Sequence, residues 1–315
     1  MVQFVDLLSS LRMLFYGFRH FTTPGFLNVL PVRPHAIFSS DSPAKNVSYW
    51  YRAHTSTTKL PIVFLHGLGI GIYPYVPFYA ELAAADKDVG IFVVESMPIS
   101  MRICHDPLTA EDTCAQIQQI LQHHSVGKFV LVSHSYGTVV SAYLLRSPIA
   151  DQIDSILLID PVAFLLHFPQ VAYNFTAREP TTANEHQLQY FASLDPGIAH
   201  TISRHFFWAE GILWKEELEG KRTAVSLGAR DLLTDTAAVW GYLTGEEVPG
   251  REEEVGVWRG RDFNGGNGKE GGAENRVLWY RDCDHGQVFD TKERRERLVR
   301  IVSGFVRGED TGKLM

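Results

Sequence analysis

Short apolar runs separated by segments with helical periodicity make up most of this chain. Seven runs have the length of strands, at residues 47–54, 61–66, 89–95, 129–132, 155–160, 223–228 and 275–280. Residues 47–54 alternate between apolar and polar positions and predict an edge strand, whereas most of the others are apolar throughout. Helical spacing recurs at residues 79–85, 106–123, 138–145 and 292–306. This alternation predicts an α/β fold with a mostly parallel central sheet and helices on both faces.

The first 46 residues do not follow this alternation of predicted strands and helices. Asp6 and Arg12 interrupt the apolar positions, so the segment predicts an amphipathic helix and neither a membrane span nor a signal peptide. A helix that packs on the domain or covers its pocket is one interpretation. A helix lying in a membrane surface, with Arg12 and Arg19 near lipid phosphates, is the other. Prolines at positions 24, 31 and 34 predict an extended connector. The apolar positions with helical spacing are Phe4, Leu7, Leu8, Leu11, Leu14, Phe15 and Phe18.

Three further segments stand apart from the predicted sheet. Residues 162–220 carry aromatic clusters at helical spacing without a strand pattern, which predicts a helical insertion that faces the substrate. Residues 245–274 are rich in glycine and charge, which predicts a mobile loop. Residues 308–315 form a C-terminal tail after the last helix. The domain itself is therefore predicted to span residues 47–307.

Composition narrows the classes of partner. The chain has 315 residues, a net charge of -7 and an isoelectric point of about 6.0, with no basic stripe, which argues against nucleic acid. The three cysteines are scattered and odd in number, which is typical of a reducing compartment. We therefore expect an intracellular protein, either cytoplasmic or bound peripherally to a membrane through residues 1–20. The sequence does not indicate an oligomeric state.

The apolar run at residues 129–132 leads directly through Ser133-His134-Ser135-Tyr136-Gly137 into a helical pattern. A strand that turns at once into a helix leaves its central residue, Ser135, exposed on a sharp turn. Only small residues fit two places before and after it, where the two backbones nearly touch. This segment resembles the G-x-S-x-G nucleophile elbow of serine α/β-hydrolases, with Ser133 in place of the first glycine.

The rest of a catalytic triad follows in the order that this family uses. His285, before Gly286 and after the last predicted strand, would be the base. Asp231, after the strand at residues 223–228, would orient that histidine. Asp160 also ends a strand and is the alternative acid, although Pro161 behind it fits a structural turn better.

The resemblance also implies an oxyanion hole and a pocket. Backbone N–H groups of Leu68, after the His66-Gly67 turn, and of Tyr136 would bind the oxyanion. His66 is expected to shape its loop by hydrogen bonding, and His134 to pack beside the elbow or form a pocket wall. The candidate pocket residues are His66, His134, Phe164, Phe168 and Trp208.

Together these residues resemble a serine α/β-hydrolase of the esterase and lipase type. The resemblance implies cleavage of a carboxylic ester through an acyl-enzyme, and the aromatic insertion favours an apolar or lipid-like substrate. A non-catalytic binding or scaffold member, a thioesterase or a lyase with the same triad remain alternatives. We expect no cofactor: the glycines of residues 67–71 lack the G-x-G-x-x-G spacing of a dinucleotide site. We also expect no metal, because no ligand spacing indicates zinc.

Overall fold

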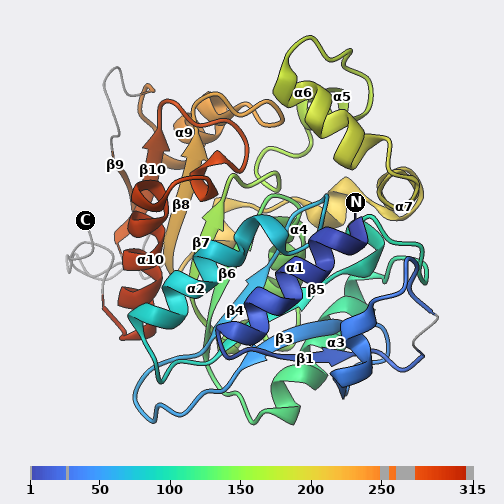
Figure 1. Ribbon diagram of the computed structural model, residues 1–315. Helices are drawn as coiled ribbons and strands as arrows, with labels where there is room; N and C mark the ends of the chain where they lie inside the picture. Colours follow the sequence, from blue (N-terminus) through green and yellow to red (C-terminus); the bar gives the residue numbers. More distant parts are fainter. Residues whose placement is uncertain (1, 26–27, 249–254, 260–273, 310–315) are drawn as a thin grey trace.

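The computed structural model describes residues 2–25, 28–248, 255–259 and 274–309. Within them a single 10-stranded sheet has the order β2-β1-β3-β5-β4-β6-β7-β8-β10-β9. Its strands are β1 (Arg19–Thr22), β2 (Ser40–Asp41), β3 (Ser48–Arg52), β4 (Ile62–Leu65), β5 (Ile91–Glu95), β6 (Phe129–His134), β7 (Ile153–Ile159), β8 (Arg222–Gly228), β9 (Val255–Arg259) and β10 (Glu274–Tyr280). Figure 1 shows the sheet running through the molecule between two layers of helices, which confirms the predicted α/β class.

The centre of the sheet is parallel. Strands β5, β4, β6, β7, β8 and β10 run in one direction, and β3 and β9 run in the other. The prediction of an edge strand at residues 47–54 is wrong, because β3 pairs with β1 on one side and β5 on the other. The residues that follow parallel strands meet at one edge of a sheet, so the loops after β4, β6, β7, β8 and β10 gather there.

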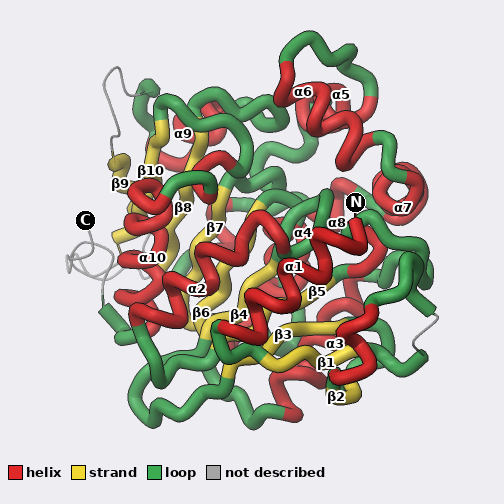
Figure 2. Tube along the Cα trace, in the orientation of Figure 1, coloured by secondary structure: helices red, strands yellow, loops and turns green. Residues whose placement is uncertain are grey.

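Helices cover both faces of the sheet, as Figure 2 shows by secondary structure. Within β4, Ile62 and Phe64 belong to one apolar core, and Val63 and Leu65 belong to the other. Because successive strand residues point to opposite faces, burial on both sides requires apolar runs without alternation. The α-helices are α1 (Val2–Phe15), α2 (Val76–Ala85), α3 (Ala110–His123), α4 (Gly137–Leu145), α5 (Gln170–Thr176), α6 (Ala183–Leu188), α7 (Pro196–His200), α8 (Trp208–Gly211), α9 (Thr236–Thr244) and α10 (Lys292–Val306).

Each layer has its own core. Met13 of α1, Phe78 of α2 and Leu298 of α10 belong to the first, on the near side of the sheet in Figure 1. Residues of α3, α4 and α9, among them Ile117 and Trp240, belong to the second. Both cores continue through the strands, so the central strands are enclosed on both faces.

Residues 162–220 are helical, as predicted, and contain α5 to α8 together with two turns of π-helix, Gln189–Ser193 and Thr201–His205. Figure 1 shows α5 and α6 at the end of the molecule toward which the arrows of β7 and β8 point. The segment therefore lies on the side of the sheet where the loops after the parallel strands gather.

Helix α1 exposes most of its apolar residues and buries two serines, whereas an ordinary surface helix exposes its polar side. It buries Ser9, Ser10 and Met13, whereas Phe4 is 71% exposed and Phe15 is 85% exposed. Leu7, Leu8, Leu11 and Leu14 are also exposed, and so is the polar Gln3. Amphipathic surface helices normally place the apolar stripe toward the core. Packing within the domain therefore does not account for the exposed apolar face of α1.

The inward polar side of α1 meets a buried network of charges. Asp6 accepts hydrogen bonds from Arg33 and lies 3.2 Å from a guanidinium nitrogen of Arg102. Arg33 also donates to both oxygens of Glu95, at 2.8 and 2.9 Å, and His20 lies 3.0 Å from the same carboxylate. Burial alone would raise the pKa of Glu95, but Arg33 and His20 hold that pKa well below its usual range. The network joins the N-terminal segment to β5 by paired charges.

The N-terminal segment is not the extended connector that its prolines predict. Strand β1 pairs with β3 inside the sheet, and the short β2 pairs with β1. Between them Pro34–Phe38 form a 3-10 helix that packs against α1. Proline in the first turn of a helix loses no hydrogen bond, so Pro34 can begin this element. The prediction treated the same proline as a residue that interrupts helices.

Two predictions about the C-terminal third fall partly outside the described residues. Of the predicted mobile loop at residues 245–274, residues 249–254 and 260–273 are not described, and Val255–Arg259 form β9, which corrects the prediction there. Residues 310–315 of the predicted tail also lie outside the described ranges. Among the described helices, none has both the length and the apolar composition that crossing a bilayer requires.

Candidate active site

Ser135 occupies a sharp turn between β6 and α4. Its φ angle is +53°, a left-handed conformation that is uncommon for residues other than glycine. A Cβ atom at Gly137 would lie 2.3 Å from the carbonyl oxygen of Leu65, so only glycine fits there. Ser133, where the family motif has glycine, is fully buried and its Oγ lies 2.8 Å from Ser141 Oγ. The larger residue is thus accommodated by a hydrogen bond.

The three predicted triad residues meet at the carboxyl edge of the sheet. His285 Nε2 lies 2.8 Å from Ser135 Oγ, and His285 Nδ1 lies 2.7 Å from Asp231 Oδ2. The other oxygen of Asp231 accepts the backbone N–H groups of Leu233 and Thr234 at 2.7 and 2.9 Å. These bonds fix the carboxylate, which in turn holds the imidazole with Nε2 toward the serine. In this geometry a serine, a histidine and a carboxylate could act as nucleophile, base and orienting acid.

Electrostatics at His285 favour a strong base. Burial lowers the pKa of His285, but the Asp231 carboxylate together with Asp160 and Asp284 outweighs it, and the net effect raises the pKa to about 9. A proton taken from Ser135 would therefore be stabilised on the imidazole as long as Asp231 stays ionised.

Asp160, the alternative acid, has another place in the structure. Its two oxygens accept the N–H groups of Gly228 and Gly286, at 2.9 and 2.8 Å. It therefore ties the strand that leads to Asp231 to the loop that carries His285. Burial, together with the nearby Asp231 carboxylate, raises the pKa of Asp160 to about 7. Of the two acids, Asp231 is the one hydrogen-bonded to the imidazole.

Two backbone N–H groups beside Ser135 are available to an oxyanion. In the described part of the chain, the N–H groups of Leu68 and Tyr136 donate no hydrogen bond. Their neighbours do, since Gly67 N–H donates to the Tyr75 hydroxyl and Gly69 N–H donates to the Ile99 carbonyl. The loop after β4 is thus held on either side of one free donor. Two donors without a partner at this place could bind an oxyanion.

The two histidines near the elbow have structural partners. His66 accepts the Ser96 N–H at Nε2, 3.1 Å away, so its Nδ1 carries the proton and donates to the Gly67 carbonyl at 2.7 Å. His134 is buried, with Nδ1 2.8 Å from the Tyr75 hydroxyl. Burial lowers the pKa of both imidazoles. Both rings are therefore neutral at pH 7, and their hydrogen bonds hold the loop after β4, directly for His66 and through Tyr75 for His134.

An apolar cavity of about 360 Å³ opens beside Ser135. Phe168 and Trp208 line it, as predicted, and Val139, Leu166, Phe175 and Phe206 complete its apolar walls. His66, His134 and Phe164 do not line this cavity, which corrects the pocket prediction for those three residues. Phe164 is fully buried in the core that α3, α4 and α9 share, because the chain is still inside the domain there and α5 begins only at Gln170. His66 instead borders a second cavity, of about 200 Å³, together with Glu95.

Comparison with known proteins identifies the family. Residues 61–242 match the family model for the alpha/beta hydrolase fold, which is more than half of the chain. The chain therefore belongs to the α/β-hydrolase family. No curated protein matches it in sequence.

Solved structures agree with this fold at low sequence identity. A membrane phospholipase A, described as a bacterial virulence factor, is 12% identical with a TM-score of 0.58, over 97% of this chain and 91% of that one. Carboxylesterase CesB (YbfK) from Bacillus subtilis is 12% identical with a TM-score of 0.54, over 98% and 99%. A meta-cleavage product hydrolase (CumD) from Pseudomonas fluorescens IP01 is 14% identical with a TM-score of 0.53, over 82% and 94%. At these identities the likeness extends to the fold alone.

Proposed function

We propose that this protein is a serine hydrolase that cleaves a carboxylic ester with an apolar, lipid-like acyl chain. The observation that carries the proposal is the hydrogen-bonded series Ser135–His285–Asp231 beside an apolar cavity. A scaffold protein would gain nothing from a strained serine whose hydroxyl faces a partly buried imidazole. Thioesterase and lyase chemistry use the same residues and are separated from ester hydrolysis by their products.

The reaction follows from the geometry. Ser135 Oγ attacks the ester carbonyl carbon while His285 Nε2 takes the hydroxyl proton. The carbonyl oxygen becomes an oxyanion that accepts the N–H groups of Leu68 and Tyr136. The intermediate then expels the alcohol, which takes the proton from His285, and leaves an acyl group on Ser135. Water repeats the sequence and releases the acid.

Acyl-chain length provides the test of the substrate class. Burying one methylene group contributes about 0.8 kcal/mol, so kcat/KM for p-nitrophenyl esters is expected to rise up to about fourfold per added methylene until the cavity is full. Replacing Ala172, a cavity-lining residue of α5, with phenylalanine is expected to lower kcat/KM for long chains about tenfold and leave the acetate ester unchanged. Ala177→Phe, at the end of the same helix and outside the cavity, is the control. A wild-type enzyme that prefers acetate, with no gain for longer chains, would refute the lipid-like substrate.

We also propose that α1 lies in a membrane surface. Its exposed face carries no charge, because its one acidic residue, Asp6, is turned inward to Arg33 and Arg102. Arg12 near its end and the exposed Arg19 behind it supply positive charge. Phe38 of the adjoining 3-10 helix, 91% exposed, extends the apolar surface. An uncharged aliphatic face flanked by arginines matches the acyl boundary and the phosphates of a phospholipid surface.

Vesicle binding tests this contact. The double variant Leu11→Gln/Phe15→Gln is expected to bind phosphatidylcholine–phosphatidylserine vesicles at least about tenfold more weakly than wild type, because two apolar side chains that the lipid would bury are lost. Leu194→Gln, at a residue 66% exposed on another surface, should bind as wild type does. Sedimentation without lipid tests the alternative, in which a second copy of this protein covers the same face of α1. A wild type that dimerises through this face and ignores vesicles would overturn the proposal.

A further inference from the structure

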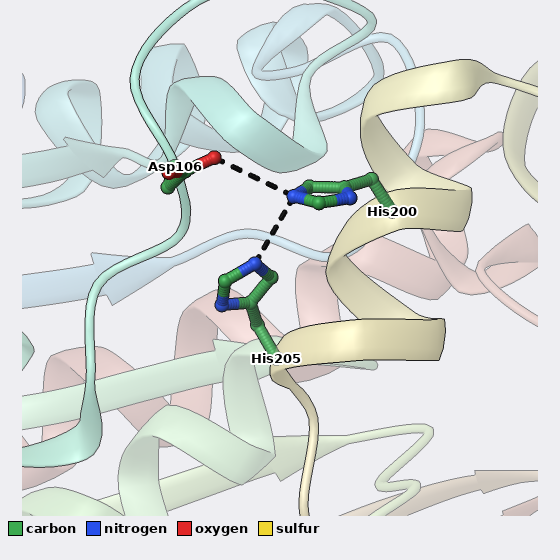
Figure 3. Close-up of side chains that lie close together, drawn as sticks. All are labelled: Asp106, His200 and His205. Carbon is green, nitrogen blue, oxygen red and sulfur yellow. Dashed lines mark hydrogen bonds and ion pairs between the residues drawn. The ribbon is translucent and has the colours of Figure 1, made fainter.

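Two histidines and an aspartate meet outside the active site, on the surface where the helical segment touches the sheet domain. Figure 3 shows His200, His205 and Asp106 with their polar atoms pointing toward one another. His200 Nε2 lies 3.0 Å from His205 Nε2 and 3.4 Å from Asp106 Oδ1. One ligand atom from each of the three residues lies within 4.8 Å of the others. They come from two segments of the chain that are almost one hundred residues apart.

A local irregularity of the helix brings the two histidines together. In an α-helix, residues five apart point about 140° away from each other, at about 100° per residue. Here α7 ends at His200 and continues as the π-helix turn Thr201–His205, whose wider turn returns the fifth residue to the same side. Ile198 and Thr201 are buried against the domain, which directs His200 outward. The π turn is thus the element that creates the cluster.

The aspartate is also held in place. It belongs to the loop that precedes α3, and the ring of the adjacent His105 lies 2.7 Å from the Asp106 carbonyl oxygen and 3.0 Å from that of Asn46. The backbone under Asp106 is thereby fixed toward the end of α7. Three ligand atoms are thus presented from anchored backbones, although Asp106 and His200 are themselves exposed.

The spacing of these atoms suits a divalent ion. Zn²⁺ lies about 2.0–2.2 Å from imidazole nitrogen and carboxylate oxygen, so neighbouring ligand atoms of a tetrahedral site are roughly 3.3 Å apart. The observed separations of 3.0 and 3.4 Å from His200 Nε2 bracket that value. Without a metal, the two imidazoles share one exposed hydrogen bond that competes with water. Imidazole and carboxylate ligands are those of Zn²⁺ and its first-row neighbours.

We propose that Asp106, His200 and His205 form a surface site for Zn²⁺, with the fourth position open to solvent. The ion would join the helical segment to the loop before α3. Ile202, Ser203 and Phe206, which follow or lie within the π turn, line the cavity beside Ser135. A bound ion therefore fixes one wall of the substrate cavity, and the site acts on the fold and takes no part in the chemistry at Ser135.

Metal binding is measured directly, without reference to hydrolysis. Protein freed of metal by chelation is titrated with ZnCl₂ in a calorimeter, and with Co²⁺ while the visible absorption is recorded. Wild type is expected to bind one Zn²⁺ and to give the intense absorption of four-coordinate Co²⁺. His200→Ala, His205→Ala and Asp106→Asn should each weaken binding at least tenfold, since even residues behind the ligands of a metal site change affinity by about 10–100-fold.

The control is His186→Ala, which removes an exposed histidine of α6 in the same helical segment. It should bind Zn²⁺ as wild type does. Saturating Zn²⁺ should also raise the unfolding temperature of wild type and of His186→Ala, and leave that of His200→Ala/His205→Ala unchanged. Equal Zn²⁺ affinity in wild type and in this double variant, or no binding by wild type at 100-fold molar excess, would overturn the proposal. None of these readouts depends on the enzyme being an esterase.

Discussion

Ser135→Ala is expected to abolish ester hydrolysis, lowering kcat by about 10⁶-fold, which is the size of the effect of removing the nucleophile of subtilisin. The hydroxyl is the atom that forms the acyl bond, and its removal leaves His285 Nε2 without a partner. Labelling by a fluorophosphonate probe, followed by mass spectrometry, checks the result and places the label on residue 135. The protein should still fold, because alanine keeps the small side chain that the turn requires.

The matched control for this variant is Ser203→Ala. Ser203 also lines the cavity but lies in the π turn, away from the triad. It should keep both labelling and hydrolysis near wild-type values. Unchanged labelling in Ser135→Ala would show that another residue is the nucleophile, and the proposed function would fall.

Asp231→Asn is expected to lower kcat by about 10⁴-fold, as the same change does in a serine protease triad. An amide cannot stabilise the imidazolium, and it can pair with the wrong tautomer of His285. The pH profile should move as well. His285 must be neutral to act as a base, and Asp231 raises its pKa to about 9, so wild-type activity should increase with pH until about 9. Without the carboxylate the pKa falls, and the rise in activity should occur at lower pH.

Asp160→Asn distinguishes the two acids. Asp160 accepts backbone N–H groups and makes no hydrogen bond to the imidazole, so its variant should keep more than about a tenth of the wild-type kcat. The pH at which its activity rises should shift less than in Asp231→Asn, because Asp160 raises the pKa of His285 less than Asp231 does. Steady-state kinetics from pH 5 to pH 10 compare the three proteins. A larger loss in Asp160→Asn than in Asp231→Asn would exchange the roles assigned to these residues.

The meeting of Ser135, Asp231 and His285 could be predicted because its signals are local. Ser135 stands between small residues at a junction of strand and helix, and Asp231 and His285 each follow an apolar strand. Since parallel strands deliver their following loops to one edge of the sheet, finding the strands was enough to bring the three together. The choice of Asp231 over Asp160 relied on Pro161, and the structure pairs Asp231 with His285.

Features built from long-range pairing gave no comparable signal. The partners of Asp6 are 27 and 96 positions away, and nothing near it in the sequence indicates that Arg33 and Arg102 turn toward it. The histidines at 200 and 205 escaped notice because their spacing gains meaning only in a π turn. Phe164 was grouped with the aromatic residues of the helical segment, although the chain is still inside the core at that point.

The ionic network under α1 holds that helix against the domain in one orientation. Arg102 has Asp6 as its ion-pair partner among the described residues, and Arg33 shares Asp6 with Glu95. Pulling the helix away would leave Arg102 without this partner and Arg33 with Glu95 alone, and breaking a buried pair costs about 3–5 kcal/mol. The apolar side of the helix therefore stays exposed, because turning it toward the domain would break these ion pairs.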